Sequence, residues 1–267
     1  MIIVNHKSKT LNPLMRDAVV ILVSFLLGLI DLSVGMGFGF TVTPIFILLG
    51  YSVTETLPAV LAGSFIGGII SSISHQRLGN VDFEYRSKPL KMVLLMGTIG
   101  ILGVFLGVYS SLNIPQKYSQ TYIGIITLSS GIFIQFKKRL SFRFSWKRIS
   151  LMGLIGAVNK GLTGGGYGPV ITSGGILSGI NERAAVAIQS FSESFVSLIG
   201  FGYYLLLGNK ILWSLTINTT LGVLIAAPIS AFFVKKISED TIKTLITTIS
   251  IIMGVSIIMK AWNLLFF

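Results

Sequence analysis

A glycine-rich stretch inside a long apolar run constrains this chain more than any other feature. Residues 159–169 hold five glycines and a proline, although they lie within an apolar run from 149 to 180. Glycine at this density does not sustain a helix, because it adds backbone entropy and offers no side chain to pack. In hydrocarbon, such a break is tolerated only where it is buried in protein or lines a wet cavity.

The composition places this run in a membrane protein. Hydrophobic residues make up 52% of the 267 residues and charged residues 11%, whereas ordinary soluble chains are about 25% charged. The net charge is +12 with the basic residues mostly in loops, which indicates membrane topology and lipid contact rather than nucleic-acid binding. With no Cys and two His, thiol chemistry, haem and most zinc sites are disfavoured and no cofactor is expected.

Eight apolar runs follow a polar N-terminal tail at residues 1–14. No small-residue cleavage site follows the first run, so we interpret it as an uncleaved helix rather than a signal peptide. A basic loop at 137–148 divides the chain, which predicts a first transmembrane repeat at 15–136 and a second at 149–267. Most runs reach the about 20 residues that a spanning helix needs. The runs cover residues 15–49, 56–74, 89–111, 118–136, 149–180, 184–207, 211–234 and 241–260.

The two halves form an internal repeat with an offset of 129 residues. One matching glycine is weak evidence, but seven matches at one offset indicate a true repeat. Paired Gly/Pro-interrupted segments in two halves are the best sequence indicator of a transporter's substrate site. The offset relates Gly35 to Gly164, Gly37 to Gly166, Phe38 to Tyr167, Gly39 to Gly168, Gly50 to Gly179, Gly79 to Gly208 and Asn80 to Asn209.

Two topologies fit this repeat. If all eight runs span the membrane, the repeats are parallel, and Lys and Arg divide 15 to 5 with the N-terminus inside. If the first and fifth runs fold back as re-entrant hairpins, the repeats are inverted, and the division is 14 to 6 with the N-terminus outside. The positive-inside rule does not separate the two, and both place the loops at 75–91 and 137–148 in the cytoplasm.

The length of the first and fifth runs favours the inverted arrangement. A run of about 32 residues reaches roughly 48 Å, against a hydrocarbon core of about 30 Å. The predicted fold is therefore an all-α polytopic membrane protein with two homologous halves. Each half begins with a helix that is broken at its glycines, and the halves are predicted to be inverted repeats.

The two glycine breaks are predicted to form the substrate site near the membrane midplane. A broken helix exposes an N-terminus with free N–H groups and a positive dipole end, which suits an anion. The alternative is that small residues simply let the helices pack closely. The predicted substrate-binding residues are Gly35, Gly37, Gly39, Asn159, Lys160, Gly164, Gly165, Gly166, Tyr167, Gly168, Gln189 and Ser190.

Three charged residues, Asp31, Lys160 and Glu193, are predicted to lie within the membrane, where charges are costly and indicate function. Asp31 and Lys160 occupy equivalent repeat positions, which predicts an ion pair; a purely structural pair and a free Lys160 are the alternatives. Glu193 lies near Ser190, which predicts a proton or cation relay, with snorkelling near a helix end as the alternative. Ser64, Ser71 and Ser72 on the second run form a weaker first-half counterpart of the polar residues around Glu193, and helix–helix contact is the favoured interpretation of them.

The Gly-Gly-Gly-Tyr-Gly-Pro break, the Ala-Val-Ala-Ile-Gln-Ser segment after it and the closing Leu-Gly-Asn element resemble the TauE/SafE family of membrane transporters. The resemblance covers residues 15–260 and implies transport of small sulfur-containing anions, such as sulfite or sulfonates, driven by an ion gradient. Related sequences carry a polar or small residue where this chain has Lys160. Pro169 directly follows the glycines, whereas Pro44 lies five residues beyond Gly39, so the two breaks are not expected to be equivalent.

The expected function is secondary transport of a small anion by a multi-pass protein of the cell membrane. The alternatives are a carrier of another small anion, such as a carboxylate, and a non-transporting scaffold. An enzyme is disfavoured, because neither a His cluster nor paired carboxylates are available for metal or acid–base chemistry. The expected partners are the anion, a proton or Na⁺ as coupling ion, and lipid, but no nucleic acid; a homodimer is left open.

Overall fold

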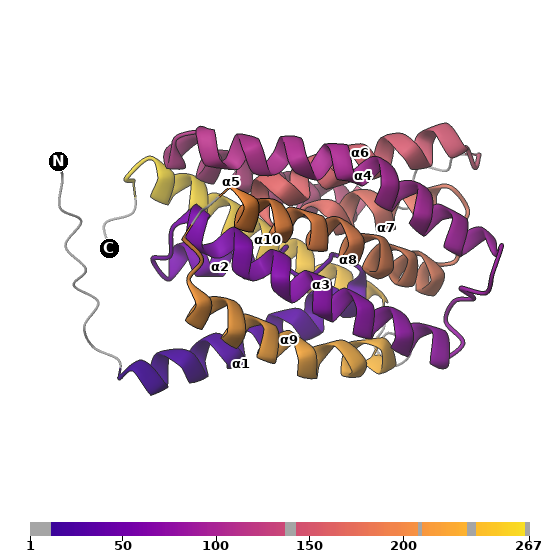
Figure 1. Ribbon diagram of the computed structural model, residues 1–267, viewed down its shortest axis with the longest axis horizontal. Helices are drawn as coiled ribbons and strands as arrows, with labels where there is room; N and C mark the ends of the chain where they lie inside the picture. Colours follow the sequence, from indigo (N-terminus) through magenta and orange to yellow (C-terminus); the bar gives the residue numbers. More distant parts are fainter. Residues whose placement is uncertain (1–11, 137–142, 208–209, 234–238, 265–267) are drawn as a thin grey trace.

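The structure is a computed structural model that describes residues 12–136, 143–207, 210–233 and 239–264. The polar tail up to residue 11 and the basic segment at 137–142 lie outside these ranges. The described residues are all-helical, with ten helices (Figure 1). By length and composition, five helical segments are able to cross a membrane: Leu14–Val34, Val53–Arg77, Lys88–Asn113, Glu182–Leu206 and Trp213–Phe233.

Both halves contain the same series of helices, in which a long helix and a short one are followed by three long ones. Every predicted apolar run corresponds to a helix, and the first and fifth runs are each broken into two. The first half contains α1 (Pro13–Val34), α2 (Val42–Leu48), α3 (Val53–Arg77), α4 (Lys88–Asn113) and α5 (Gln116–Phe136). The second half contains α6 (Trp146–Thr163), α7 (Tyr167–Leu177), α8 (Glu182–Leu206), α9 (Trp213–Phe233) and α10 (Glu239–Ala261).

The helix caps follow the same repeat. Ser52 begins α3 with a capping box, in which its hydroxyl accepts from the Glu55 N–H and the Glu55 carboxylate accepts from the Ser52 N–H. Asn181 lies 129 residues later and begins α8, where its side chain accepts from the Arg183 N–H at 3.0 Å. These caps satisfy N–H groups that have no partner within the helix. Equivalent positions therefore start equivalent helices by the same chemistry.

The backbone of the two breaks repeats as well. Gly35 ends α1 with φ 71° and Gly164 ends α6 with φ 70°, a left-handed conformation that glycine adopts readily. Gly37 and Gly166, two residues further on, also have positive φ values of 78° and 75°. The first break extends over residues 35–41, whereas the second covers only 164–166. The two breaks are thus unequal, as the different proline positions predicted.

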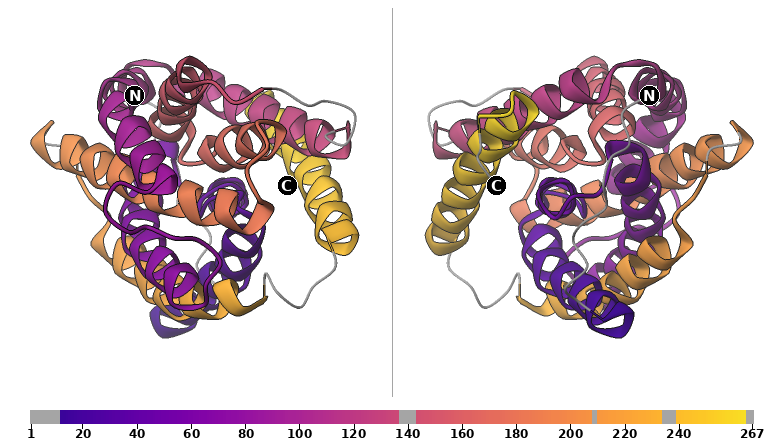
Figure 2. Two further views of the ribbon diagram at one scale, coloured as in Figure 1. Left: turned by 90° about the vertical axis from the view of Figure 1, so that its right-hand side faces the viewer. Right: turned by 90° about the vertical axis from the view of Figure 1, so that its left-hand side faces the viewer.

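Each half packs mainly against the other half rather than against itself. α1 packs on α9, and the equivalent pair is α6 on α4. α3 packs on α8, and α5 packs on α10 at one side of the bundle (Figure 2). The two halves are therefore interleaved, and neither buries its helices without the other.

Glycine contacts show that four pairs of neighbouring helices from different halves run parallel. In α4, a Cβ at Gly103 would lie 2.9 Å from the Ala157 Cβ, and one at Gly107 would lie 2.9 Å from the Gly161 Cα. Later residues of α4 therefore contact later residues of α6, so the two helices are parallel. Three other helix pairs show the same parallel order. The contacts are Ser24–Gly222 and Gly28–Ala226 between α1 and α9, Gly63–Thr219 and Gly67–Val223 between α3 and α9, and Gly100–Val196 and Val104–Gly200 between α4 and α8.

Equivalent helices, in contrast, run in opposite directions. Gly68 lies against Ser194 while Gly200 lies against Leu61, so α3 and α8 are antiparallel. The parallel pairs then place α1, α3 and α9 in one direction and α4, α6 and α8 in the other. α5 and α10 are antiparallel to each other, since Gly124 lies against Ile258 and Gly254 against Leu128.

The short helix α7 turns back along α6. A Cβ at Gly156 would lie 3.0 Å from the Tyr167 ring, and one at Gly174 would lie 2.8 Å from the Met152 sulfur. Early residues of α7 therefore face late residues of α6, and the reverse. The break at residues 164–166 is the tip of this helical hairpin.

The tight α4–α6 contact predicts a large effect of a small change. Gly107→Ala places a methyl group 2.9 Å from the Gly161 Cα, and overpacking of this kind costs typically about 1–3 kcal/mol. We expect the variant to unfold at a lower temperature in detergent. Gly202→Ala is the matched control, because nothing lies within 4 Å of a Cβ at that helical position. Equal thermal stability of the two variants would contradict the close approach.

Candidate functional site

The two glycine breaks meet in direct backbone contact. A Cβ at Gly165 would lie 2.9 Å from both the Gly39 carbonyl oxygen and the Phe40 Cα. A Cβ at Gly168 would collide with the backbone of Met36. The structure thus brings the two breaks together, as the repeat predicted. It presses their backbones against each other, so any ligand between them requires the breaks to separate.

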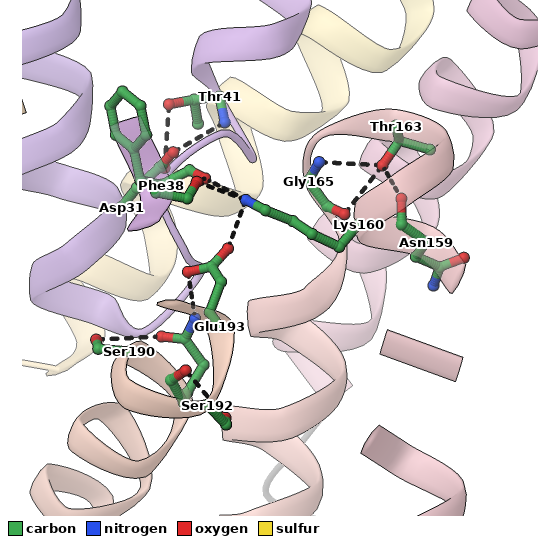
Figure 3. Close-up of polar contacts among 12 residues, drawn as sticks. Asp31, Phe38, Thr41, Asn159, Lys160, Thr163, Gly165, Ser190, Ser192 and Glu193 are labelled. Carbon is green, nitrogen blue, oxygen red and sulfur yellow. Dashed lines mark hydrogen bonds and ion pairs between the residues drawn. The ribbon is translucent and has the colours of Figure 1, made fainter. Parts of the chain in front are cut away.

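Lys160 occupies the centre of this junction and is fully buried, with 0% of its surface exposed. Its ammonium group donates to the Phe38 carbonyl at 2.7 Å and to Glu193 Oε1 at 2.7 Å (Figure 3). It also donates to the Ser64 hydroxyl at 2.6 Å. Lys160 comes from α6, near the point where that helix breaks. One cation therefore links α6, the first break, α3 and α8.

Glu193 supplies the negative charge that pairs with Lys160. Its Oε1 forms an ion pair with the Lys160 ammonium, and its Oε2 accepts from Gln189 Nε2 at 2.8 Å. The carboxylate also lies against the first break, since a Cβ at Gly37 would be 2.6 Å from Oε1. Glu193 is 1% exposed, so the snorkelling alternative is wrong for this residue.

Asp31 has a different partner from the one that the repeat register predicted. One carboxylate oxygen accepts from the Thr41 N–H at 3.0 Å, and the other accepts from the Thr41 hydroxyl at 3.0 Å. Thr41 directly precedes α2, so Asp31 ties the end of α1 to the start of the half-helix. The expected Asp31–Lys160 ion pair is therefore corrected to Lys160–Glu193, because Glu193 from α8 reaches the ammonium directly.

Ser64 belongs to this network, although the sequence favoured a helix–helix contact for it. Its hydroxyl accepts from Lys160 and donates to the Phe38 carbonyl at 2.7 Å. Ser64 and Glu193 are 129 residues apart, the same spacing that relates Asp31 to Lys160. The repeat offset thus distinguishes Ser64 from the other serines of the second run as the position equivalent to Glu193.

The second break borders a cavity of about 520 Å³. Asn159 and Gly166 line it, and both were predicted to bind substrate. The Asn159 amide oxygen accepts from the Tyr122 hydroxyl at 2.6 Å, which joins α6 to α5. The lining is mostly apolar and comes from α5, α6 and α7, with Ile126, Ser129, Arg148, Leu151, Met152, Pro169, Val170, Gly174, Leu177 and Ser178 as the other members.

The remaining predicted residues divide between the junction and its surroundings. Tyr167 is completely buried, with its ring against Gly156. Gly35 accepts through its carbonyl from the Thr172 hydroxyl, which ties the first break to α7. The Ser190 hydroxyl donates to the Gln189 amide oxygen at 3.5 Å, and among the described residues it forms no hydrogen bond with Lys160 or Glu193. The Lys160 network therefore includes only part of the predicted set.

The chemical group that the junction offers to a ligand is one buried cation, the Lys160 ammonium. A buried ammonium is stable only when paired and hydrogen-bonded, and Lys160 has a carboxylate, a carbonyl and a hydroxyl as partners. Metal binding has no comparable support, since no group of three or more His, Asp or Glu side chains assembles among the described residues. The geometry therefore suits recognition of an anion more than metal or acid–base catalysis.

Comparisons with known proteins relate the chain to membrane transporters. The family model described as Sulfite exporter TauE/SafE matches residues 20–257 of the chain. The chain is also similar to a protein of Bacillus subtilis (strain 168) named Probable membrane transporter protein YtnM, with 26% identity over 248 residues. That alignment covers 88% of this chain and 80% of the relative. Both similarities extend through the two halves and include each glycine break.

The ion pair generates a double-mutant prediction. Lys160→Met or Glu193→Gln alone should lower the free energy of unfolding by about 3–5 kcal/mol, because each leaves a buried charge without its partner. The double variant should recover much of the loss, which appears as a coupling energy in denaturation of the purified protein. Asp31→Asn combined with Lys160→Met is the control and should show weaker coupling. Simple addition of the Lys160 and Glu193 losses would contradict the pairing.

Proposed function

Since the chain belongs to the TauE/SafE sulfite exporter family of membrane transporters, we propose that it moves a small sulfur-containing anion, such as sulfite or an organosulfonate. The family makes the chain a multi-pass membrane transporter rather than an enzyme. The sulfur chemistry of the substrate is inferred from the family's description. The position of the site is inferred from the residues of this chain.

The buried Lys160 ammonium is the observation that supports an anion site at the junction. It lies where both glycine breaks meet, and two of its three partners are uncharged oxygens. A charged ammonium forms strong, short hydrogen bonds with an oxyanion. The glycines around it let the backbone approach a ligand closely once the breaks separate. We therefore place the substrate at Lys160, between the segments 35–41 and 164–166.

A small carboxylate is the second candidate substrate. The present partner of Lys160 is itself a carboxylate, that of Glu193, at 2.7 Å. A site that already holds one carboxylate is compatible with another of similar size and charge. The first candidate rests on the family and the second on this contact, and a direct flux measurement separates them.

Transport into proteoliposomes tests the proposal. With labelled sulfite, methanesulfonate and lactate in parallel, we expect flux of a sulfur-containing anion that falls at least about tenfold in Lys160→Met, the loss of about 1.4 kcal/mol of binding or more. Lys91→Met is the matched control, because Lys91 lies exposed on α4. Flux of lactate alone would favour the carboxylate carrier. Absence of flux for all three, with the protein folded, would favour a non-transporting scaffold.

We also propose that the two halves are inverted repeats in the membrane, with the α1–α2 and α6–α7 units as re-entrant hairpins. The opposite directions of equivalent helices support this, as does the way α7 turns back along α6. In this arrangement the loops after α3 and α5 share one side, with 14 of the basic residues against 6 on the other. The positive-inside rule then places the loop after α3 in the cytoplasm.

Cysteine labelling tests this topology, because the sequence contains no Cys. We expect Asn263→Cys to react with a membrane-impermeant maleimide in intact cells, since the inverted arrangement places the end of α10 outside. Glu84→Cys, in the loop between α3 and α4, should react only after the membrane is permeabilised. Both residues are exposed in the structure. Protection of both positions in intact cells would instead indicate parallel repeats.

A further inference from the structure

The buried charges at the junction do not balance. Asp31, Lys160 and Glu193 are each 0–1% exposed, which gives one potential cation and two potential anions. With all three ionised, the local charge is −1, and a bound monovalent anion would make it −2. Burying uncompensated charge is costly in a low-dielectric interior. An anion can therefore bind at Lys160 favourably only if a carboxylate loses its charge.

Glu193 already occupies the place that an anion would take. Its Oε1 is 2.7 Å from the Lys160 ammonium. On its other side, a Cβ at Gly37 would lie only 2.6 Å from Oε1 and 2.8 Å from Oε2. A second oxyanion does not fit between the ammonium and the first break while the Glu193 carboxylate remains there. Substrate and Glu193 must therefore compete for Lys160.

Resting on the proposed function, we propose that the Glu193 carboxylate is a built-in substitute for the transported anion, and that each anion displaces it together with one proton. In the empty carrier, Lys160 pairs with ionised Glu193. On binding, the anion takes the place at the ammonium, a proton from solution adds to a Glu193 carboxylate oxygen, and the protonated side chain moves aside. The net charge of the site is the same before and after binding.

Glu193 is better suited than Asp31 to be the carboxylate that is protonated and displaced by the anion. Both oxygens of Asp31 accept hydrogen bonds from Thr41, which anchors the start of α2. The ionisable groups that interact with Glu193 are Lys160 from α6, Asp31 from α1 and Tyr167 from α7. On its own helix it accepts from the neutral Gln189 amide.

The other two helices packed against α8 bring no ionisable group to the middle of the junction. α3 contributes the uncharged Ser64 hydroxyl, and its ionisable residues are Glu55, His75 and Arg77, near its ends. α4 has Lys88, Lys91 and Tyr109, also toward its ends. Glu193 is therefore the carboxylate whose protonation directly frees the Lys160 ammonium.

This exchange makes the proton a co-substrate that moves in the same direction as the anion. The ion pair lets the empty carrier return without exposing an unpaired charge in the membrane. If Glu193 is neutralised permanently, Lys160 has no internal partner in the empty state. Such a carrier should still exchange one anion for another, but its empty return and its response to a proton gradient should be lost.

The test measures anion binding as a function of pH. Methanesulfonate is a suitable probe, because it keeps one negative charge between about pH 6 and about pH 8. By linkage, uptake of one proton per anion makes binding about tenfold tighter for each unit fall in pH. We expect this dependence in the wild type, and tighter, pH-independent binding in Glu193→Gln. Glu182→Gln, on the same helix but outside the network, should retain the wild-type dependence.

Two further measurements keep the outcome decisive. Asp31→Asn should retain the pH dependence, and its loss there but not in Glu193→Gln would overturn the assignment to Glu193. If Glu193→Gln does not fold, proton uptake by the wild type in weakly buffered solution should equal one proton per anion bound. Binding without pH dependence or proton uptake would overturn the exchange but leave the proposed function intact. Absence of binding by methanesulfonate, sulfite and lactate at every pH would overturn both.

Discussion

The ion pair between Lys160 and Glu193 is the interaction on which the centre of the molecule depends. Its two residues come from α6 and α8, and the same ammonium holds the Phe38 carbonyl of the first break and Ser64 of α3. A lysine buried this completely is stable only with such partners. The contact therefore fixes the position of the first break relative to three helices and leaves the charge of Lys160 satisfied without a ligand.

The glycine breaks make this contact geometrically accessible. An unbroken helix would satisfy its own carbonyls, but the break at residues 35–41 turns the Phe38 carbonyl toward Lys160. Close backbone contact between the two breaks leaves no room for a side chain at Gly165 or Gly168. The same residues thus pack the breaks together and border the proposed anion site, so the two interpretations of the glycines in the sequence are not exclusive. Under the proposed function, a ligand at the junction requires the backbones of the two breaks to separate.

The repeat determined how far inference from the sequence could reach. Its offset predicted that the two breaks would meet, and it also relates Ser64 to Glu193. It led to the wrong partner for Lys160, because equivalent positions need only lie near the symmetry axis. Two carboxylates, those of Asp31 and Glu193, were possible partners for Lys160, and both oxygens of Asp31 already accept hydrogen bonds from Thr41. The choice depends on side-chain reach and local hydrogen bonds, which an offset does not describe.

The sequence by itself determined the membrane class, the family resemblance, the helices and their breaks, because hydrophobic run length and glycine density act locally along the chain. Only the tertiary structure decided which buried charges pair, which helices interleave and which way equivalent helices run. These depend on contacts between residues far apart in the chain, such as the 33 residues that separate Lys160 from Glu193 and the 96 that separate Ser64 from Lys160. Composition constrains such contacts weakly, since several buried groups can compete for the same partner.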